Sequence, residues 1–442
     1  MKKRARWVLT AMLALLVSAV TTGCSFRLVA SPEELYSLPS LPTEYTSLSN
    51  RIQQLIASGM EYAAPVSGSN TQNVQLIDLD GDGEQEAVVF LRNSAEEQPL
   101  RIHMFTSGAN GYEETGVISG SGSNIYSFNA RDLNGDGALE LLVGWETGME
   151  MRALTVYSRQ NGELMRTGYG KYAVADLNQD AAQELVVFRT DEQGNNIADL
   201  YVWGDGLEKT SSVRLSVTMA ELNVGSIVTG TLQDGSAALF SCGVRGEVLA
   251  LDLLKMTENR LENLVFSQVI GMTTEMFRYR GLMAEDINHD GITEFPAAAP
   301  LPDGSGGEHY RVDWYSYSGA GLRHAELSTY YNSLDGWYLE LPQTWIGQFS
   351  VTRERVGTDE ISVTFSRRDE SGAPVLRICA ITGSGREQRA ARGNRLILSR
   401  QTDVIYTAEL LAGNTGWAGT VTEEQLRRSF HLIERKWAAG DN

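Results

Sequence analysis

The sequence predicts a mainly β fold followed by a smaller region in which strands and helices are mixed. Three observations support this expectation: an acidic phrase returns five times along the chain, short apolar segments flank each copy, and the repeat stops after Tyr331. Apolar residues make up 42% of the 442 residues, which is ordinary for a folded protein and sufficient for more than one core.

The N-terminal segment has the pattern of a targeting signal. Four basic residues within the first six positions precede an uncharged apolar run from Trp7 to Val20, and small residues then lead to Cys24. The run is shorter than the roughly 20 residues that a membrane-spanning helix needs, so residues 1–23 are expected to be a cleaved signal peptide. The end of this segment resembles the lipobox of bacterial lipoproteins, although Thr21 stands where the family prefers leucine. The resemblance implies a lipid on Cys24 and an anchor on the extracytoplasmic face of the cell membrane, and the alternative is ordinary secretion.

The charge of the chain excludes one class of partner. Removal of residues 1–23 takes away four basic residues and no acid, so the net charge moves from −19 to −23. A surface this acidic repels phosphate backbones, so nucleic acid is not an expected partner, whereas cations are favoured. Beyond Cys24 the chain has only Cys242 and Cys379, which are too few for a disulfide framework and are expected to be buried thiols.

Residues 24–61 are expected to form a tether and one short helix. The first half of this segment is rich in Ser, Pro and Leu without a sustained period, as in a linker. After Thr46, apolar residues such as Leu48 and Ile52 return at helical spacing, and Gly59 stands where a left-handed helix stop is wanted.

The repeated phrase reads Asp-apolar-Asp/Asn-x-Asp-Gly-x-x-Glu-apolar. Its copies begin at Asp78, Asp132, Asp176, Gly230 and Asp286, which lie 44 to 56 residues apart. This period suits a unit of four strands better than a helical hairpin.

The same order of four strands can be traced in each copy. A short apolar strand leads into the phrase and a second leaves it, as at residues 74–77 and 87–91. An alternating third strand follows, then a turn such as Asn161-Gly162 and a more polar fourth strand. The expected third strands cover residues 101–105, 154–158, 200–203, 248–253 and 312–317. Four strands per repeat are typical of a propeller blade, so residues 62–331 are expected to form a β-propeller of five blades, with up to seven left open.

Residues 332–442 are expected to form a separate α+β domain. Strands are predicted at residues 337–342, 361–367, 375–381, 395–399 and 404–411. A closing helix is predicted from the capping-box pair Thr422 and Gln425, with an apolar stripe formed by Leu426, Phe430, Ile433 and Trp437.

The phrase itself has the composition of a calcium loop. Oxygens at its first, third and fifth positions can face inward, a carboxylate at its ninth position can bind through both oxygens, and glycine at its sixth permits the tight backbone. Flanking strands and the early closing acid distinguish it from an EF-hand. The three complete copies offer Asp78, Asp80, Asp82 and Glu86; Asp132, Asn134, Asp136 and Glu140; and Asp286, Asn288, Asp290 and Glu294.

The other two copies are incomplete. The copy with Asp176, Asn178, Asp180 and Glu184 keeps these candidate ligands but has Ala181 in place of glycine. The copy that begins at Gly230 has lost most of its oxygens and keeps Asp234. Three calcium sites are therefore expected, and a fourth is left open.

These phrases resemble the FG-GAP or VCBS class of repeats, which occur in integrin-α-like propellers and many bacterial surface proteins. The resemblance covers about residues 74–328. It implies a propeller with calcium in the loop between the first two strands of a blade. Integrin-type propellers have seven blades, whereas five repeats are visible here. Calcium is expected to pin the turns, and the alternative is a catalytic or ligand-bridging role.

The sequence contains no convincing catalytic set. The five histidines, His103, His289, His309, His324 and His431, are scattered and accompany no HExxH or GxSxG motif, and His289 is expected to face solvent within its calcium loop. Aromatic residues gather near the end of the repeats and could stack on sugar rings or pack in a core: Trp314, Tyr315, Tyr317, Tyr330, Tyr331, Trp337, Tyr338 and Trp345. Residues 302–308 could form a rim element or a plain hairpin connection.

The leading hypothesis is a lipid-anchored module on the cell surface that binds or scaffolds a protein or glycan. It follows from fold analogy, and propellers serve many functions. The alternatives are a carbohydrate-active envelope enzyme with its site in the propeller funnel, and an envelope assembly factor that acts through the C-terminal domain.

Overall fold

The computed structural model describes residues 45–108, 111–148, 151–301 and 309–433. The predicted signal peptide, Cys24, the predicted tether, residues 302–308 and Trp437 lie outside these ranges. By its internal contacts the chain divides into one unit with residues 1–59 and 108–112 and another with residues 60–107 and 113–442. No helix within the described ranges combines the length and the apolar character needed to span a membrane.

The first unit contains α2 (Thr46–Ala57), which confirms the predicted helix. Leu48 and Ile52 form its buried face, as their spacing predicts. Gly59 follows with φ of +101°, a conformation that favours glycine, so the helix ends where expected.

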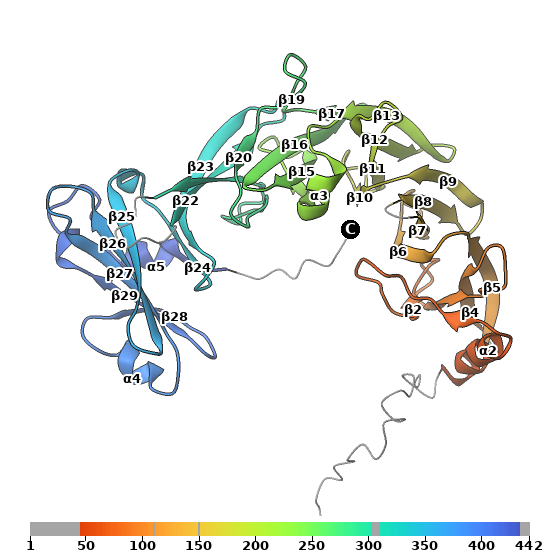
Figure 1. The fold of residues 1–442 in the computed structure, drawn as a ribbon, viewed down its shortest axis with the longest axis horizontal. Helices are drawn as coiled ribbons and strands as arrows, with labels where there is room; N and C mark the ends of the chain where they lie inside the picture. Colours follow the sequence, from red (N-terminus) through yellow and green to blue (C-terminus); the bar gives the residue numbers. More distant parts are fainter. Residues whose placement is uncertain (1–44, 109–110, 149–150, 302–308, 434–442) are drawn as a thin grey trace, which may run out of the picture. The chain divides into compact units, whose positions relative to one another are not determined.

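Four antiparallel sheets follow one another along the chain, each a meander in sequence order (Figure 1). The first contains β2 (Val74–Ile77), β3 (Glu86–Arg92), β4 (Leu100–Gly108) and β5 (Gly111–Gly120), and β1 (Glu61–Tyr62) also pairs with β3. The second contains β6 (Asn124–Arg131), β7 (Glu140–Gly148), β8 (Met151–Ser158) and β9 (Gly162–Gly168). The third contains β10 (Lys171–Ala175), β11 (Glu184–Thr190), β12 (Asn196–Trp203) and β13 (Leu207–Arg214). The fourth contains β14 (Ser226–Thr231), β15 (Ala237–Arg245), β16 (Val248–Thr257) and β17 (Arg260–Asn263), with β20 (Met276–Arg278) paired to β16. We call these sheets blades 1 to 4.

The second strand of a blade is apolar on both of its faces. In β3 every residue from Ala87 to Leu91 is fully buried. A continuous apolar run of this kind is expected where a sheet is covered on both sides. Side chains of blades 1 and 2 meet in one core, where the rings of Phe90 and Phe128 lie 5.0 Å apart. The predicted class, mainly β with propeller-type blades, is thus confirmed.

The fifth sheet, blade 5, differs from the other blades. It contains β21 (Phe295–Pro300), β22 (Tyr310–Tyr317), β23 (Arg323–Asn332), β24 (Trp337–Glu340) and β30 (Phe430–Leu432) in that order. The expected first strand is reduced to a single bridge between Glu285 and Glu294. Strand β24 and the distant β30 extend the other edge instead.

The predicted domain boundary between residues 331 and 332 falls inside this sheet. Strand β23 crosses it, and β24 pairs with β23. Tyr330 also shares one hydrophobic core with Trp337, Phe365 and Phe430. The structure therefore joins residues 332–442 to blade 5 through both backbone pairing and a common core.

The remaining C-terminal elements form a last sheet in the order β25-β26-β27-β29-β28. Its strands are β25 (Phe349–Arg355), β26 (Glu360–Arg367), β27 (Pro374–Ile381), β28 (Leu396–Arg400) and β29 (Ile405–Leu410), and four of them match predicted strands. Short helices α4 (Arg386–Ala390) and α5 (Glu423–Ser429) accompany the sheet.

The closing helix is shorter than predicted. The capping box of Thr422 and Gln425 is present, so its start is confirmed. Helix α5 nevertheless ends at Ser429, and Phe430 pairs with Leu339 in strand β30. The predicted helical stripe through Phe430 and Ile433 is wrong, because the free edge of β24 offers the backbone partners that a further helical turn would otherwise supply.

The sequence did not predict α3 (Met219–Val224), β25, or the hairpin of β18 (Phe266–Ser267) and β19 (Met272–Thr273).

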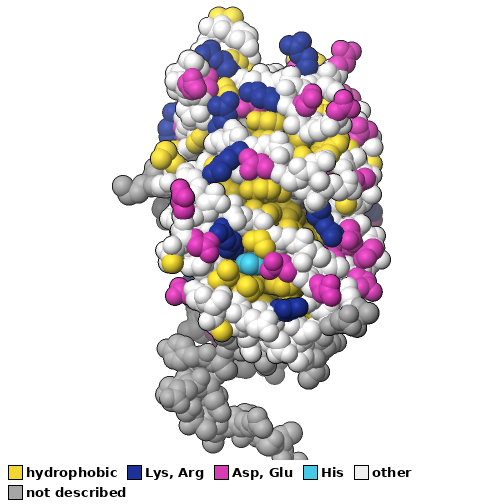
Figure 2. Space-filling view, turned by 90° about the vertical axis from the view of Figure 1, so that its right-hand side faces the viewer, with side chains coloured by type: hydrophobic (Ala, Val, Ile, Leu, Met, Phe, Trp, Pro, Cys, Tyr) yellow, Lys and Arg dark blue, Asp and Glu magenta, His cyan; other side chains and the backbone are white. Residues whose placement is uncertain are grey.

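The face in Figure 2 belongs to the side of Figure 1 where β5 and β9 lie, and patches of hydrophobic side chains there are flanked by charged ones.

Candidate metal centres

Four copies of the acidic phrase form loops with one common backbone. We call the loops that begin at Asp78, Asp132, Asp176 and Asp286 loops 1, 2, 3 and 5, after their blades. In each, the carboxylate of the first residue accepts a hydrogen bond from the amide N–H of the sixth residue: Gly83 at 3.0 Å, Gly137 at 2.9 Å, Ala181 at 3.0 Å and Gly291 at 3.0 Å. The first aspartate therefore closes the turn by itself.

Two residues of each loop adopt positive φ. At the sixth position the values are +88° for Gly83, Gly137 and Gly291, and +79° for Ala181. A side chain in this region costs roughly 1–2 kcal/mol, so loop 3 reaches the shared conformation under strain. The structure thus gives loop 3 the geometry of the complete copies, although its sequence lacks the glycine.

The ninth residue of each loop is a buried glutamate. Glu86, Glu140, Glu184 and Glu294 are between 0% and 3% exposed. In each, Oε2 accepts the amide N–H of the second residue of the loop, at 2.8 to 3.1 Å. The Oε1 atoms of Glu86 and Glu294 are also buried and have no hydrogen-bond partner among the described residues. A buried acceptor without a donor is unfavourable unless a cation or water satisfies it, so these oxygens fit a metal ligand.

The electrostatics of these glutamates agree with that interpretation. Burial raises the pKa of Glu86, Glu140 and Glu184 above the usual range, against the lowering effect of the backbone hydrogen bond. For Glu294 burial, together with Asp290 and Asp286, raises the pKa to about 8. Burial and repulsion between neighbouring carboxylates both disfavour the ionised form of these glutamates. A hard cation bound among the oxygens would stabilise that form by neutralising its charge.

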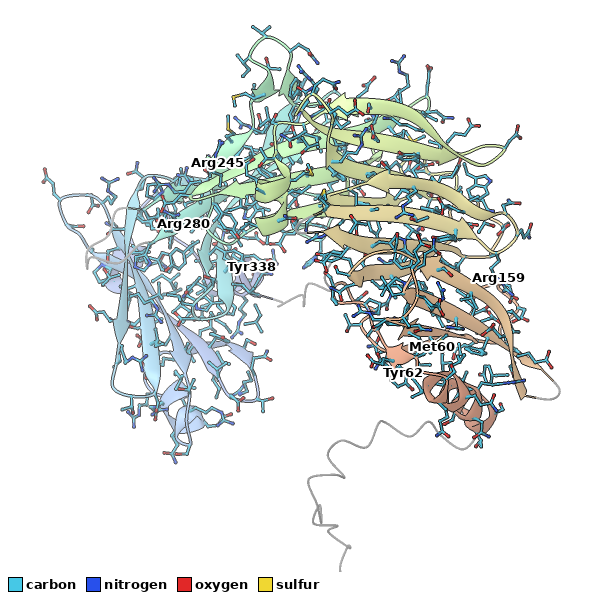
Figure 3. All side chains as sticks on the ribbon, turned by 45° about the vertical axis from the view of Figure 1, so that its right-hand side comes forward. Met60, Tyr62, Arg159, Arg245, Arg280 and Tyr338 are labelled. Atoms are coloured by element: carbon cyan, nitrogen blue, oxygen red, sulfur yellow. The ribbon has the colours of Figure 1, made fainter. Side chains whose placement is uncertain are left out.

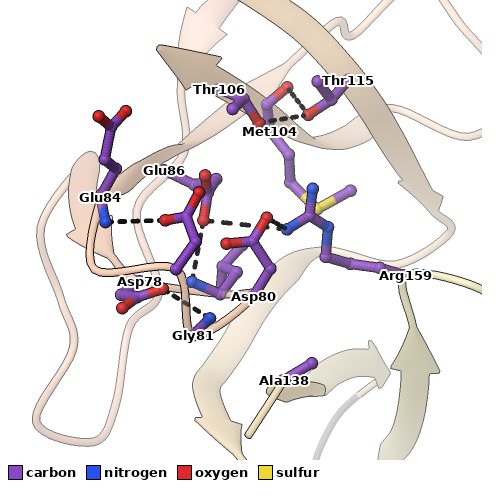
Figure 4. A network of polar contacts seen from close by, with 12 residues as sticks. Asp78, Asp80, Gly81, Glu84, Glu86, Met104, Thr106, Thr115, Ala138 and Arg159 are labelled. Carbon is purple, nitrogen blue, oxygen red and sulfur yellow. Dashed lines mark hydrogen bonds and ion pairs between the residues drawn. The ribbon is translucent and has the colours of Figure 1, made fainter.

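Loop 1 brings three acidic side chains together. One oxygen atom each from Asp78, Asp80 and Glu86 lies within 4.8 Å of the others (Figure 4). Its third position is aspartate, whereas loops 2, 3 and 5 carry an asparagine whose amide donates to the fifth-position aspartate at 2.9 to 3.0 Å. Loop 1 is therefore the most acidic of the four.

An arginine from blade 2 compensates for the extra charge of loop 1. Arg159 lies in the turn between β8 and β9 (Figure 3), and its Nη1 donates to Oδ2 of Asp80 at 2.7 Å. The same nitrogen lies 3.9 Å from Oε2 of Glu86. The hydrogen bond from Arg159 lowers the pKa of Asp80. The sequence analysis did not identify Arg159. The available signal was weak: loop 1 alone has an aspartate at its third position, and a basic residue occurs in a turn of the next blade.

The copy in blade 4 is not built as a metal loop. Asp234 lies in a short turn and pairs with Lys255 Nζ at 3.1 Å. Hydrogen bonds from Ser236 and Lys255 lower the pKa of Asp234 to about 2. The ammonium group of Lys255 thus pairs with the carboxylate that this copy retains.

Most of the other predicted residues lie apart from these loops. His289 is exposed within loop 5, as expected. His103 on β4 contacts Glu114, and His431 on β30 contacts Glu340. Six residues of the aromatic cluster are at most 5% exposed, which confirms packing for them: Trp314, Tyr317, Tyr330, Trp337, Tyr338 and Trp345. Cys242 and Cys379 are buried free thiols, as predicted.

Comparison with known proteins identifies the repeat. The family model of the FG-GAP-like repeat matches residues 78–143, which include loops 1 and 2. Residues 78–143 therefore match an FG-GAP-like repeat, as the sequence predicted. No curated protein matches it.

Solved structures resemble this protein only distantly. Rhamnogalacturonan lyase YesW aligns over 70% of this chain and 66% of its own, with 10% identity and a TM-score of 0.29. A rhamnogalacturonan lyase from Bacillus licheniformis aligns over 71% of both chains, with 13% identity and a TM-score of 0.29. Aleuria aurantia lectin aligns over 78% of this chain and 98% of its own, with 10% identity and a TM-score of 0.23.

Proposed function

We propose that this protein is a calcium-stabilised module that binds or scaffolds a protein or glycan on the cell surface. The observation that supports it is the shared geometry of four loops, each with acidic side chains around a buried glutamate. The ligand class is proposed by fold analogy, and the proposed anchor is a lipid on Cys24 at the extracytoplasmic face of the membrane.

Calcium in these loops would act on the structure rather than on a substrate. The loops lie between the first and second strands of a blade, and two of them contact the next blade. The amide of Leu139 donates to the carbonyl of Leu79 in loop 1 at 2.9 Å, and Gln179 in loop 3 donates to the carbonyl of Gly235 at 2.9 Å. An ion that orders a loop would therefore also order a junction between blades.

Titration calorimetry on the metal-stripped protein tests the calcium proposal. Three or four sites are expected, with loop 3 as the fourth. Absence of binding heat, together with identical melting curves in calcium and in chelator, would remove the proposal.

The anchor is tested separately by Cys24→Ala in the full-length precursor. The variant is expected to leave the membrane fraction or to remain unprocessed. A variant that stays lipid-labelled and membrane-bound would overturn the assignment of Cys24.

A further inference from the structure

A cavity of about 450 Å³ opens between blades 1 and 2, beside loop 1. Its walls come from β4 and β5 on one side and from β7, β8 and the following turn on the other. Met104, Val117 and Tyr157 supply apolar surface, and Val117 is 41% exposed. Polar groups, among them Thr115, Ser158 and Arg159, make up the rest of the lining, and a concave site with both kinds of surface can take a small molecule.

Arg159 belongs both to this cavity and to loop 1. It lines the cavity, while its guanidinium reaches Asp80 at 2.7 Å (Figure 4). Its side chain is 28% exposed, so the guanidinium is accessible from solvent. The cation that could receive an anionic ligand is thus held by a carboxylate of the metal loop.

Calcium in loop 1 would compete with this arginine. A bound ion takes carboxylate oxygens at roughly 2.3–2.6 Å and carries two positive charges. A guanidinium at hydrogen-bond distance from the same carboxylate would then face a like charge, which is unfavourable. In loops 2, 3 and 5 the third residue is an uncharged asparagine, whose amide donates to the fifth-position aspartate.

We infer that the cavity between blades 1 and 2 binds a small organic anion with an apolar body, and that calcium in loop 1 frees Arg159 to receive the acidic group. The apolar wall takes the body of the ligand, and the released guanidinium forms a charge-assisted hydrogen bond with its acid. Glu163 also lines the cavity, but its carboxylate is exposed to solvent and therefore attracts the guanidinium of Arg159 only weakly. The calcium part of this inference rests on the proposed function.

The test uses the fluorescent anion anilinonaphthalene sulfonate as a probe of the intact protein. In calcium the wild type is expected to bind it roughly tenfold more tightly than in chelator, because one charge-assisted hydrogen bond is gained. Arg159→Gln is expected to remove this difference and to raise the calcium affinity of loop 1. Lys255→Gln is the matched control, because Lys255 pairs with Asp234 of the blade 4 copy and does not line the cavity. This variant should bind the probe as wild type does, both in calcium and in chelator.

Asp80→Asn separates the inference from the calcium proposal. It gives loop 1 the residue that loops 2, 3 and 5 already carry, so folding is expected to persist, and it releases Arg159 without calcium. In chelator this variant should bind the probe as tightly as wild type does in calcium. If calorimetry detects no calcium, the proposed function fails and this variant alone decides the cavity. The inference is overturned if Asp80→Asn still binds the probe weakly in chelator, or if calcium still strengthens probe binding by Arg159→Gln.

Discussion

At the scale of single residues, the loops show how a backbone conformation is specified. Three of the four sixth positions have glycine, and loop 3 holds Ala181 at a φ of +79°. The loop forms nevertheless, because Asp176 and buried Glu184 make the same hydrogen bonds as their counterparts. Local side-chain acceptors therefore outweigh the strain of one alanine.

Ala181→Gly is expected to stabilise the protein by about 1 kcal/mol, because glycine adopts a positive φ without the side-chain clash. The reverse change in loop 2, Gly137→Ala, should destabilise it by a similar amount, and an added Cβ there meets no atom within 4 Å, so strain alone acts. Urea unfolding measures both. Equal stability of Gly137→Ala and wild type would contradict the strain argument.

A buried carboxylate in blade 3 gives a pH prediction. Asp199 on β12 is fully buried and lies 2.7 Å from both Arg189 and Lys209. Burial alone would raise the pKa of Asp199, but hydrogen bonds from Lys209, Ser212 and Arg189 outweigh it and hold the pKa below its usual value. A lowered folded-state pKa means that the stabilisation is complete above the unfolded pKa and is lost as the pH falls through the folded pKa.

Asp199→Asn is therefore expected to destabilise the protein by about 1–2 kcal/mol at neutral pH, because two partly exposed cations lose a charged hydrogen-bond partner. The difference in unfolding free energy between this variant and wild type should shrink as the pH falls through the acid range in which Asp199 becomes protonated. Denaturant unfolding at several pH values measures it, with the exposed Asp205→Asn as control. A difference that stays constant down to strongly acidic pH would show that packing, and not charge, is responsible.

At the scale of elements, the edge of blade 5 decides how the C-terminal region is attached. Strand β30 occupies the outer side of β24, and Phe430 packs 5.7 Å from Trp337. A strand edge without a partner exposes unpaired backbone groups, so recruitment of the last residues of the described chain closes that edge.

Limited proteolysis is expected to cut the turn after β23, where Leu334 is 78% exposed, without separating the fragments. The two sides should stay together because β23 and β24 are paired and Tyr330 shares a core with Trp337. Native gel filtration followed by a denaturing gel detects this outcome. Fragments that elute apart would restore the predicted boundary between residues 331 and 332.

At the scale of the whole molecule, calcium is expected to act on several blades at once. Each site at a hundredfold excess of calcium over Kd contributes about 2.7 kcal/mol when only the native state binds. Chelation should therefore lower the melting temperature markedly. Acid should have the same effect, since ligating carboxylates must be ionised to bind.

Asp132→Ala is expected to remove one calcium site and lower the stability in calcium, because it deletes both a candidate ligand and the acceptor for the amide of Gly137. Asp234→Ala is the matched control, since Lys255 already occupies that carboxylate, and it should leave the calcium stoichiometry unchanged. Calorimetry decides between them. Loss of one site in Asp234→Ala would show that the blade 4 copy binds calcium after all.

The sequence by itself determined the strands of the repeats and the candidate ligands of the loops. Both are local properties: the ligands of loop 1 span nine residues, from Asp78 to Glu86, and apolar runs such as Ala87 to Leu91 specify the central strands. Loop 3 shows the limit of a prediction from local sequence. Because it lacks the glycine, the sequence left its calcium site open, whereas the structure gives Ala181 the same positive φ as the glycines of the other loops.

Only the tertiary structure decided which distant residues meet. Arg159 reaches Asp80 across 79 positions of sequence, and β30 pairs with β24 although about ninety residues separate them. Such contacts depend on which blade lies beside which and on which strand edge remains open. The fold also decided which oxygens are buried without a partner, since the burial of Glu86 and Glu294 is produced by packing around the loops and not by the phrase that encodes them.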